Sequence, residues 1–206
     1  TIVNLVCRFY EPTEGCVRID GADYRTRSQH WLHSALGYVL QTPHLFSGTI
    51  ADNIRFARPD APMEDVVRAA KLCAAHDFIA ALPQGYDTQV GEGGGRLSTG
   101  QKQLVCFARV LVADPRIFVL DEATSSIDTE TEQLIQNAIH TVLKGRTSFV
   151  VAHRLSTVRT ADKILVIDAG RIAEAGTHDE LMAQKGRYYS LYTHQYRSEA
   201  QRAFRA

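Results

Sequence analysis

The chain has 206 residues, of which 45% are hydrophobic, 22% charged and 8% aromatic, so a wholly disordered chain is excluded. Lysine plus arginine number 23, and so do aspartate plus glutamate. The resulting net charge of zero argues against binding through bulk charge, and we expect no nucleic-acid partner. Because no apolar run approaches the ~18–20 residues needed to cross a bilayer, the chain by itself is not expected to span a membrane. The four cysteines lack the paired spacing of a zinc site, which fits a reducing, cytosolic setting.

The first expected element is a helix over residues 1–10, in which Ile2, Leu5, Val6 and Phe9 keep helical spacing. No capping residue precedes it and the chain does not begin with Met, so we expect a piece of a longer protein. A strand is expected over 16–20 and a short β-rich run over 37–40.

Helical patterns dominate residues 49–113, with helices expected over 63–75 and 76–82 and a third beginning near Ser98. Strands and helices alternate again beyond Arg116. The expected strands are 117–120, 147–152, 163–168 and 172–175, and the expected helices are 129–143, 178–184 and 187–195. This order predicts one α/β domain over 1–206, with a mostly parallel sheet covered by helices on both faces. We expect 49–113 to be an inserted helical subdomain, and 187–206 to be a C-terminal helix and polar tail.

Polar side chains follow three of the expected strands. Asp121 and Glu122 end the apolar run 117–120, His153 follows the run 148–152, and Gln41 follows 38–40. Because parallel strands deliver their carboxyl ends to a ligand crevice, these side chains are expected at one edge of the sheet. Phosphate chemistry uses one carboxylate to hold Mg²⁺ and another to orient the attacking water. Each residue taken alone also fits an ordinary strand end or a capping histidine.

A second candidate lies in the helical region, where a glycine-rich run precedes the segment 97–101. Ser98 is a good N-cap residue, and Gly100 leaves its backbone N–H open to close approach. A helix N-terminus with small residues can bind an anion, although a plain helix cap is the simpler alternative.

Together, three segments strongly resemble the nucleotide-binding domain of ATP-binding cassette (ABC) transporters, and the resemblance covers nearly the whole chain. The segments are 97–101, 120–128 and 152–157. The resemblance implies the P-loop NTPase-like fold of an ABC ATPase, acting on ATP with Mg²⁺. It implies that Glu122, His153 and Gln41 are catalytic, and that Asp121 and Gln41 hold the metal. The nucleotide contacts that it implies are Leu97, Ser98, Thr99, Gly100, Gln101, Ser126 and Asp128.

Three further segments, 8–15, 44–50 and 87–94, are typical of the exporter branch of that family. They imply an exporter of a drug, lipid or other substrate, at the cytoplasmic face of the plasma membrane. The implied partners are a second nucleotide-binding domain, in a homodimer or heterodimer, and a transmembrane domain fused upstream. That domain is expected to contact the Gln41 loop and residues 88–93 (Thr88 to Gly93).

Two features depart from the family pattern. The phosphate loop GxxxxGK[ST] does not occur in these 206 residues, so we expect the chain to begin just downstream of it and to be inactive alone. Thr99 stands where the family most often has Gly. Two other functions stay open: a soluble ABC-type ATPase without a membrane domain, and a non-enzymatic scaffold. The upstream coding sequence would distinguish them.

Overall fold

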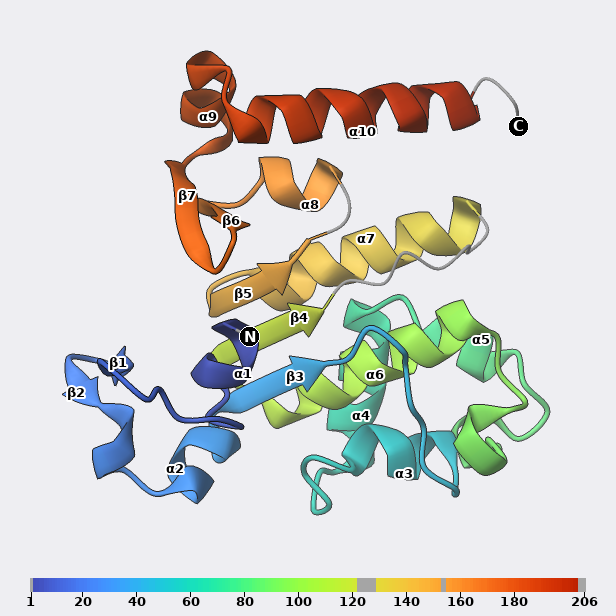
Figure 1. Cartoon of the computed structure of the whole chain (residues 1–206). Coiled ribbons are helices and arrows are strands. Elements are labelled where there is room, and N and C mark those ends of the chain that lie inside the picture. The colour runs from blue at the N-terminus through green and yellow to red at the C-terminus, as the bar shows by residue number, and fades with distance from the viewer. Residues whose placement is uncertain (1, 122–128, 153–154, 204–206) are drawn as a thin grey trace. The chain divides into compact units, whose positions relative to one another are not determined.

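The computed structural model describes residues 2–121, 129–152 and 155–203 (Figure 1). The chain divides into two compact units, Thr1–Val151 and Ala152–Ala206. Within these residues no helix is both long enough and apolar enough to cross a membrane. The expected single domain over 1–206, with its insertion at 49–113, stays a prediction.

The first unit is built on a parallel sheet of three strands in the order β3 (Leu36–Val39), β4 (Ile117–Asp121) and β5 (Thr147–Val151). The register pairs Val39 with Leu120 and Asp121 with Val151. The centre of β4 is buried on both faces, which explains why its sequence is continuously apolar rather than alternating. The predicted α/β class with a parallel sheet is confirmed.

Two long helices, α6 (Thr99–Ala113) and α7 (Thr129–Leu143), cover one face of this sheet (Figure 1). Phe118 and Leu120 of β4 share a single apolar core with residues from both helices. The contact between α6 and β3 is close: a Cβ added at Gly37 would lie 2.7 Å from the Cγ1 of Val110 and 2.6 Å from the Cγ of Pro115. Glycine at this position therefore lets the helix approach the strand.

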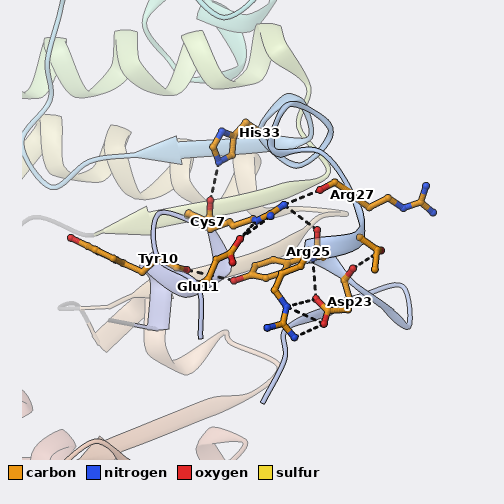
Figure 2. A network of polar contacts seen from close by, with 10 residues as sticks. Cys7, Tyr10, Glu11, Asp23, Arg25, Arg27 and His33 are labelled. Carbon is orange, nitrogen blue, oxygen red and sulfur yellow. Dashed lines mark hydrogen bonds and ion pairs between the residues drawn. The ribbon is translucent and has the colours of Figure 1, made fainter. Parts of the chain in front are cut away.

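The N-terminal segment packs against the same sheet through the ring of Phe9, whose centroid lies 5.9 Å from that of Tyr38. Helix α1 (Ile2–Val6) is shorter than the expected 1–10, because Arg8 takes a left-handed conformation with φ 55°. Arg8 then donates to the carbonyl oxygens of Tyr24 and Arg27 and pairs with Glu11 (Figure 2).

The region around this network contains a hairpin and a short helix. Strands β1 (Arg18–Ile19) and β2 (Ala22–Asp23) pair antiparallel, and helix α2 (Gln29–Ser34) follows the 3₁₀ helix η1 (Tyr24–Thr26). The strand expected over 16–20 ends at Ile19 because Asp20 and Gly21, with φ of 50° and 80°, form a tight turn. Arg25 binds the Asp23 carboxylate and lowers the pKa of that group to about 2 (Figure 2).

Residues 50–113 contain helices and no strand, as the sequence predicts. Within this region, the α-helices before α6 are α3 (Ile50–Arg55), α4 (Met63–Leu72) and α5 (His76–Ala80). Two 3₁₀ helices, η2 (Gly85–Asp87) and η3 (Glu92–Gly94), lie between α5 and α6. The expected helix 63–75 ends early because Ala74 has a φ of 56°, which breaks the helical path.

The described residues of the second unit form a hairpin and three helices. Strands β6 (Ile164–Asp168) and β7 (Arg171–Gly176) pair antiparallel across Ala169 and Gly170, both with positive φ, as the sequence pattern predicts. The helices are α8 (Leu155–Arg159), α9 (His178–Gln184) and α10 (Arg187–Ala203). Helix α10 is longer than the predicted 187–195, since its polar C-terminal part is helical to Ala203.

Candidate functional site

Gln41 and Asp121 follow the carboxyl ends of neighbouring parallel strands. Val39, the last residue of β3, pairs with Leu120, so Asp121 at the end of β4 and Gln41 two residues beyond β3 share one edge of the sheet. Gln41 is exposed and Asp121 is half-buried. Burial raises the pKa of the Tyr38 phenol, and the negative charge of Asp121 raises it further.

This edge offers oxygen ligands of the kind that Mg²⁺ prefers, a carboxylate from Asp121 and an amide oxygen from Gln41. The described ranges contain no group of three or more His, Cys, Asp or Glu side chains that could hold a metal ion. Four of the predicted site residues lie outside the residues that the structure describes: Glu122, Ser126, Asp128 and His153.

The segment 97–101 forms the N-terminal end of α6. Ser98 Oγ accepts from the backbone N–H of Gln101 at 3.2 Å, and Gln101 Oε1 accepts from the N–H of Ser98 at 3.0 Å. This reciprocal pair is a capping box. Leu97 and Gly100 are buried, whereas Ser98 and Thr99 are exposed, so the β-branched side chain of Thr99 is accommodated within this chain.

The position of this helix end suits anion binding. Helix α6 runs antiparallel to β4, so its Ser98 end lies on the side to which β3 and β4 point (Figure 1). The 15 residues of α6 give a full helix dipole with its positive end at Ser98. Exposed small residues and a positive helix end can receive a negatively charged group from outside the chain.

Residues 88–93 lie beside part of residues 42–50, which are called the stretch after Gln41 below. The N–H of Ile50 donates to Thr88 O at 3.1 Å, and the N–H of Val90 donates to Gly48 O at 3.0 Å. Thr49 and Gln89 form an isolated antiparallel bridge between the same two stretches. Val90 is fully buried while Gln89 is exposed, so the segment is anchored from inside and presents polar residues outward.

Sequence reasoning missed a polar cluster made by Asn53 and Arg109, which binds main-chain atoms of residues 44–49. Asn53 is only 2% exposed although it is polar, and Arg109 is half-buried in an otherwise apolar part of α6. The available signal was a polar residue among apolar ones: Arg109 in the helix predicted to begin near Ser98, and Asn53 within the predicted helical region 49–113. The pairing of these two residues, 56 positions apart, is tertiary and has no local pattern.

Comparison with known proteins identifies the family. The family described as "ABC transporter" matches residues 1–125. The chain belongs to the ABC transporter family. The expectation that rested on the resemblance is thereby confirmed, together with the ABC ATPase fold.

Two curated relatives and one solved structure illustrate the similarity of this ABC transporter chain. It is 52% identical, over 95% of its length and 32% of the relative's, to the Bacillus subtilis "Uncharacterized ABC transporter ATP-binding protein YknV". It is 49% identical, over 93% of its length and 30% of the relative's, to a Mycobacterium bovis "Fatty acid ABC transporter ATP-binding/permease protein". It also matches the "Structure of a bacterial Atm1-family ABC exporter with ATP bound", with a TM-score of 0.86 and 48% identity, covering 94% of this chain and 34% of that one.

This ABC transporter chain therefore spans about a third of the length of the relatives it matches. The family assigns nucleotide binding to the chain in general terms.

Proposed function

We propose that this chain is the ATP-binding and ATP-hydrolysing part of an ABC exporter, which couples hydrolysis to movement of a substrate out of the cell. The observation that supports it best is the shared sheet edge of Gln41 and Asp121 in a chain that also presents a capped, exposed helix end at Ser98. The similarity to an exporter with ATP bound supports the same function.

Within this proposal, Asp121 and Gln41 hold Mg²⁺ through a carboxylate and an amide oxygen. When bound, the metal neutralises the charge that develops on the phosphate oxygens. The position of Asp121 supports this role, because the residue ends a strand and is only half-buried. Gln41 adds a ligand atom without adding negative charge, which reduces repulsion toward a polyphosphate.

Glu122 is assigned to the attacking water. A carboxylate beside the metal site can orient the water and accept its proton. His153 is assigned to the γ-phosphate, where an imidazole N–H can donate a hydrogen bond. Both assignments rest on the family resemblance.

The Ser98 end of α6 is assigned to the nucleotide of a second such domain, packed head to tail. Leu97, Thr99, Gly100 and Gln101 belong to the same helix end, and Ser126 and Asp128 are assigned to nucleotide contacts by resemblance. The positive helix end at Ser98 supports this role, because it would face the phosphates of an ATP held by the partner.

A membrane part is the other proposed partner. The Gln41 loop and the segment Thr88 to Gly93 are proposed as its contact, and the backbone bonds that join 88–90 to 48–50 support a single continuous surface. The printed name "ATP-binding/permease protein" of one relative supports a fused membrane part. It also weighs against a soluble ABC-type ATPase. The proposed place on the cytoplasmic face of the plasma membrane rests on the family resemblance.

The experiment uses the complete protein that contains this chain, reconstituted in lipid vesicles. We expect ATP hydrolysis that needs Mg²⁺ and that rises when a transported compound is supplied, for example a fatty acid or a hydrophobic drug. ATP hydrolysis by a protein that stays in the soluble fraction would favour the soluble ATPase instead. Absence of Mg²⁺-dependent hydrolysis would contradict the proposal.

A further inference from the structure

Arg109 reaches from α6 to the stretch that follows Gln41. Its Nε donates to the carbonyl oxygen of Asn53 at 2.8 Å, and one terminal nitrogen donates to Asn53 Oδ1 at 2.9 Å. The other terminal nitrogen donates to the carbonyl oxygen of His44 at 3.1 Å. The three bonds use the forked shape of the guanidinium, which a point charge cannot reproduce.

Asn53, which Arg109 holds, in turn binds the main chain of Phe46. Its Oδ1 also accepts from the Phe46 N–H at 2.8 Å, and its Nδ2 donates to the Phe46 carbonyl at 2.8 Å and to that of Thr49 at 3.0 Å. Because Arg109 can only donate, its bond to Oδ1 selects the amide orientation in which both Phe46 bonds form. The main chain at Phe46 is thus held by a side chain whose orientation Arg109 determines.

The aromatic surroundings of Arg109 complete the cluster. The guanidinium carbon lies 5.3 Å from the ring centroid of Phe46 and 5.6 Å from that of Phe56. These two rings stack at 4.1 Å, and they are 40% and 56% exposed. Among the residues with described positions, no carboxylate pairs with Arg109, and its burial lowers the pKa of the guanidinium. The cation is therefore held by carbonyl and amide oxygens and by aromatic faces.

We propose that Arg109 is a positioning residue for hydrolysis: it keeps the stretch after Gln41 in a fixed place relative to the helix that begins at Ser98. This inference rests on the proposed function, in which Gln41 and Ser98 serve ATP hydrolysis. Helix α6 is continuous from Thr99 to Ala113, so a tether at Arg109 fixes the stretch relative to the whole helix. Without the tether, the stretch after Gln41 can shift, while the residues that contact the nucleotide are still present.

The first test measures whether the tether exists, by amide hydrogen exchange in the complete protein. In Arg109→Lys, we expect exchange at the Phe46 amide to accelerate at least about tenfold, because its acceptor loses a fixed orientation. The Val90 amide, which donates to Gly48 O, is the internal reference and should change less than about twofold. Unchanged exchange at Phe46 would overturn the proposal.

Arg58→Lys is the matched control. Arg58 also donates to a carbonyl of α6, that of Val112 at 3.3 Å, and pairs with Asp65, while its described hydrogen bonds do not involve residues 44–46. The Arg58→Lys substitution therefore removes a comparable arginine contact to the same helix and leaves the contacts of the stretch after Gln41 unchanged. We expect the Phe46 amide to exchange normally in this control.

The second test separates positioning from a general structural role. At a temperature at which all variants are folded, we expect Arg109→Lys to lower kcat for ATP hydrolysis at least about fivefold with KM within about twofold, and Arg58→Lys to change neither. Should the lysine variant fail to fold, Arg109→Gln is judged by the same two measurements. An unchanged kcat with accelerated Phe46 exchange, or an equal loss in both arginine variants, would overturn the positioning role. If the unmodified protein does not hydrolyse ATP, the proposed function fails, and the exchange result still decides whether Arg109 holds the stretch.

Discussion

The Asn53 side chain binds the main chain of Phe46 on both sides: its Oδ1 accepts from the Phe46 N–H and its Nδ2 donates to the Phe46 carbonyl, each at 2.8 Å. One buried amide thus does for this loop what a neighbouring strand does in a sheet. The loop carries Gln41 at its start and leads into α3, so its shape affects the candidate site directly.

We predict that Asn53→Ala destabilises the fold by about 2–4 kcal/mol, because it leaves several buried polar groups without partners. Asn137→Ala is the control, since Asn137 is exposed and accepts one bond from Gln133 within the same helix. That change should cost no more than about 0.5 kcal/mol. Urea unfolding of both variants measures the difference, and equal midpoints would show that the Asn53 bonds contribute little.

Gly37→Ala is predicted to destabilise the fold by about 1–3 kcal/mol, because the added methyl overlaps Val110 and Pro115 in a packed core. Gly95→Ala provides the comparison. Its Cβ would meet only the carbonyl oxygen of Glu92, at the ordinary contact distance of 3.4 Å. Thermal melting should show a clear loss for the first variant and little change for the second. Similar melting temperatures for the two variants would mean that β3 and α6 can move apart without loss of stability.

Thiol reactivity should differ sharply along the chain. Cys7, Cys73 and Cys106 are buried and Cys16 is exposed. Burial raises the pKa of the Cys7 thiol to about 11, so almost none of it is the reactive thiolate at pH 8. We predict that a maleimide labels Cys16 first at pH 8, and that Cys7 reacts only as the pH approaches its raised pKa. Mass spectrometry of the labelled peptides checks this, and early labelling of Cys7 would contradict the packing of the N-terminal segment.

Much of the fold was predictable where the signal is local. Helix 178–184 has the predicted bounds because Thr177 and Glu180 form a capping box, and Ser98 caps α6 for the same reason. The ends of α1 and α4 were wrong because Arg8 and Ala74 adopt positive φ without being glycine. At Arg8 the conformation is accompanied by tertiary bonds to the carbonyls of Tyr24 and Arg27, whereas at Ala74 it closes the helix through local bonds to Ala70 and Lys71.

The candidate site, like the fold, was predictable only where the sequence signal is local. Strand ends predicted that Gln41 and Asp121 would share an edge, and the parallel register confirms it. The link from Arg109 through Asn53 to Phe46 was not predictable, because it joins residues that are distant in sequence and no local pattern pairs them. The predictions for Glu122, Ser126, Asp128 and His153 stay predictions.

The head-to-tail arrangement predicts the effect of Ser98→Arg in a dimer with one altered chain. Hydrolysis should be lost at the site that holds its nucleotide on the partner's phosphate loop, because a bulky side chain blocks the approach of the helix end. Ser98→Ala separates this effect from the loss of the helix cap, which costs about 1 kcal/mol. Single-turnover hydrolysis, measured in dimers in which one of the two nucleotide sites is labelled, shows which site has lost activity. Loss confined to the altered chain's own nucleotide would contradict the arrangement.

Glu122→Gln in the complete protein tests whether ATP is hydrolysed at the edge of the sheet beyond Asp121. The amide keeps the size of the side chain but cannot accept a proton from water. We predict that ATP still binds with similar affinity, that turnover falls by at least about 100-fold, and that the ATP-bound dimer accumulates. Glu64→Gln, on the exposed surface of α4, should keep the parental rate. Hydrolysis by Glu122→Gln at nearly the parental rate would show that Glu122 is not the base and would contradict the account.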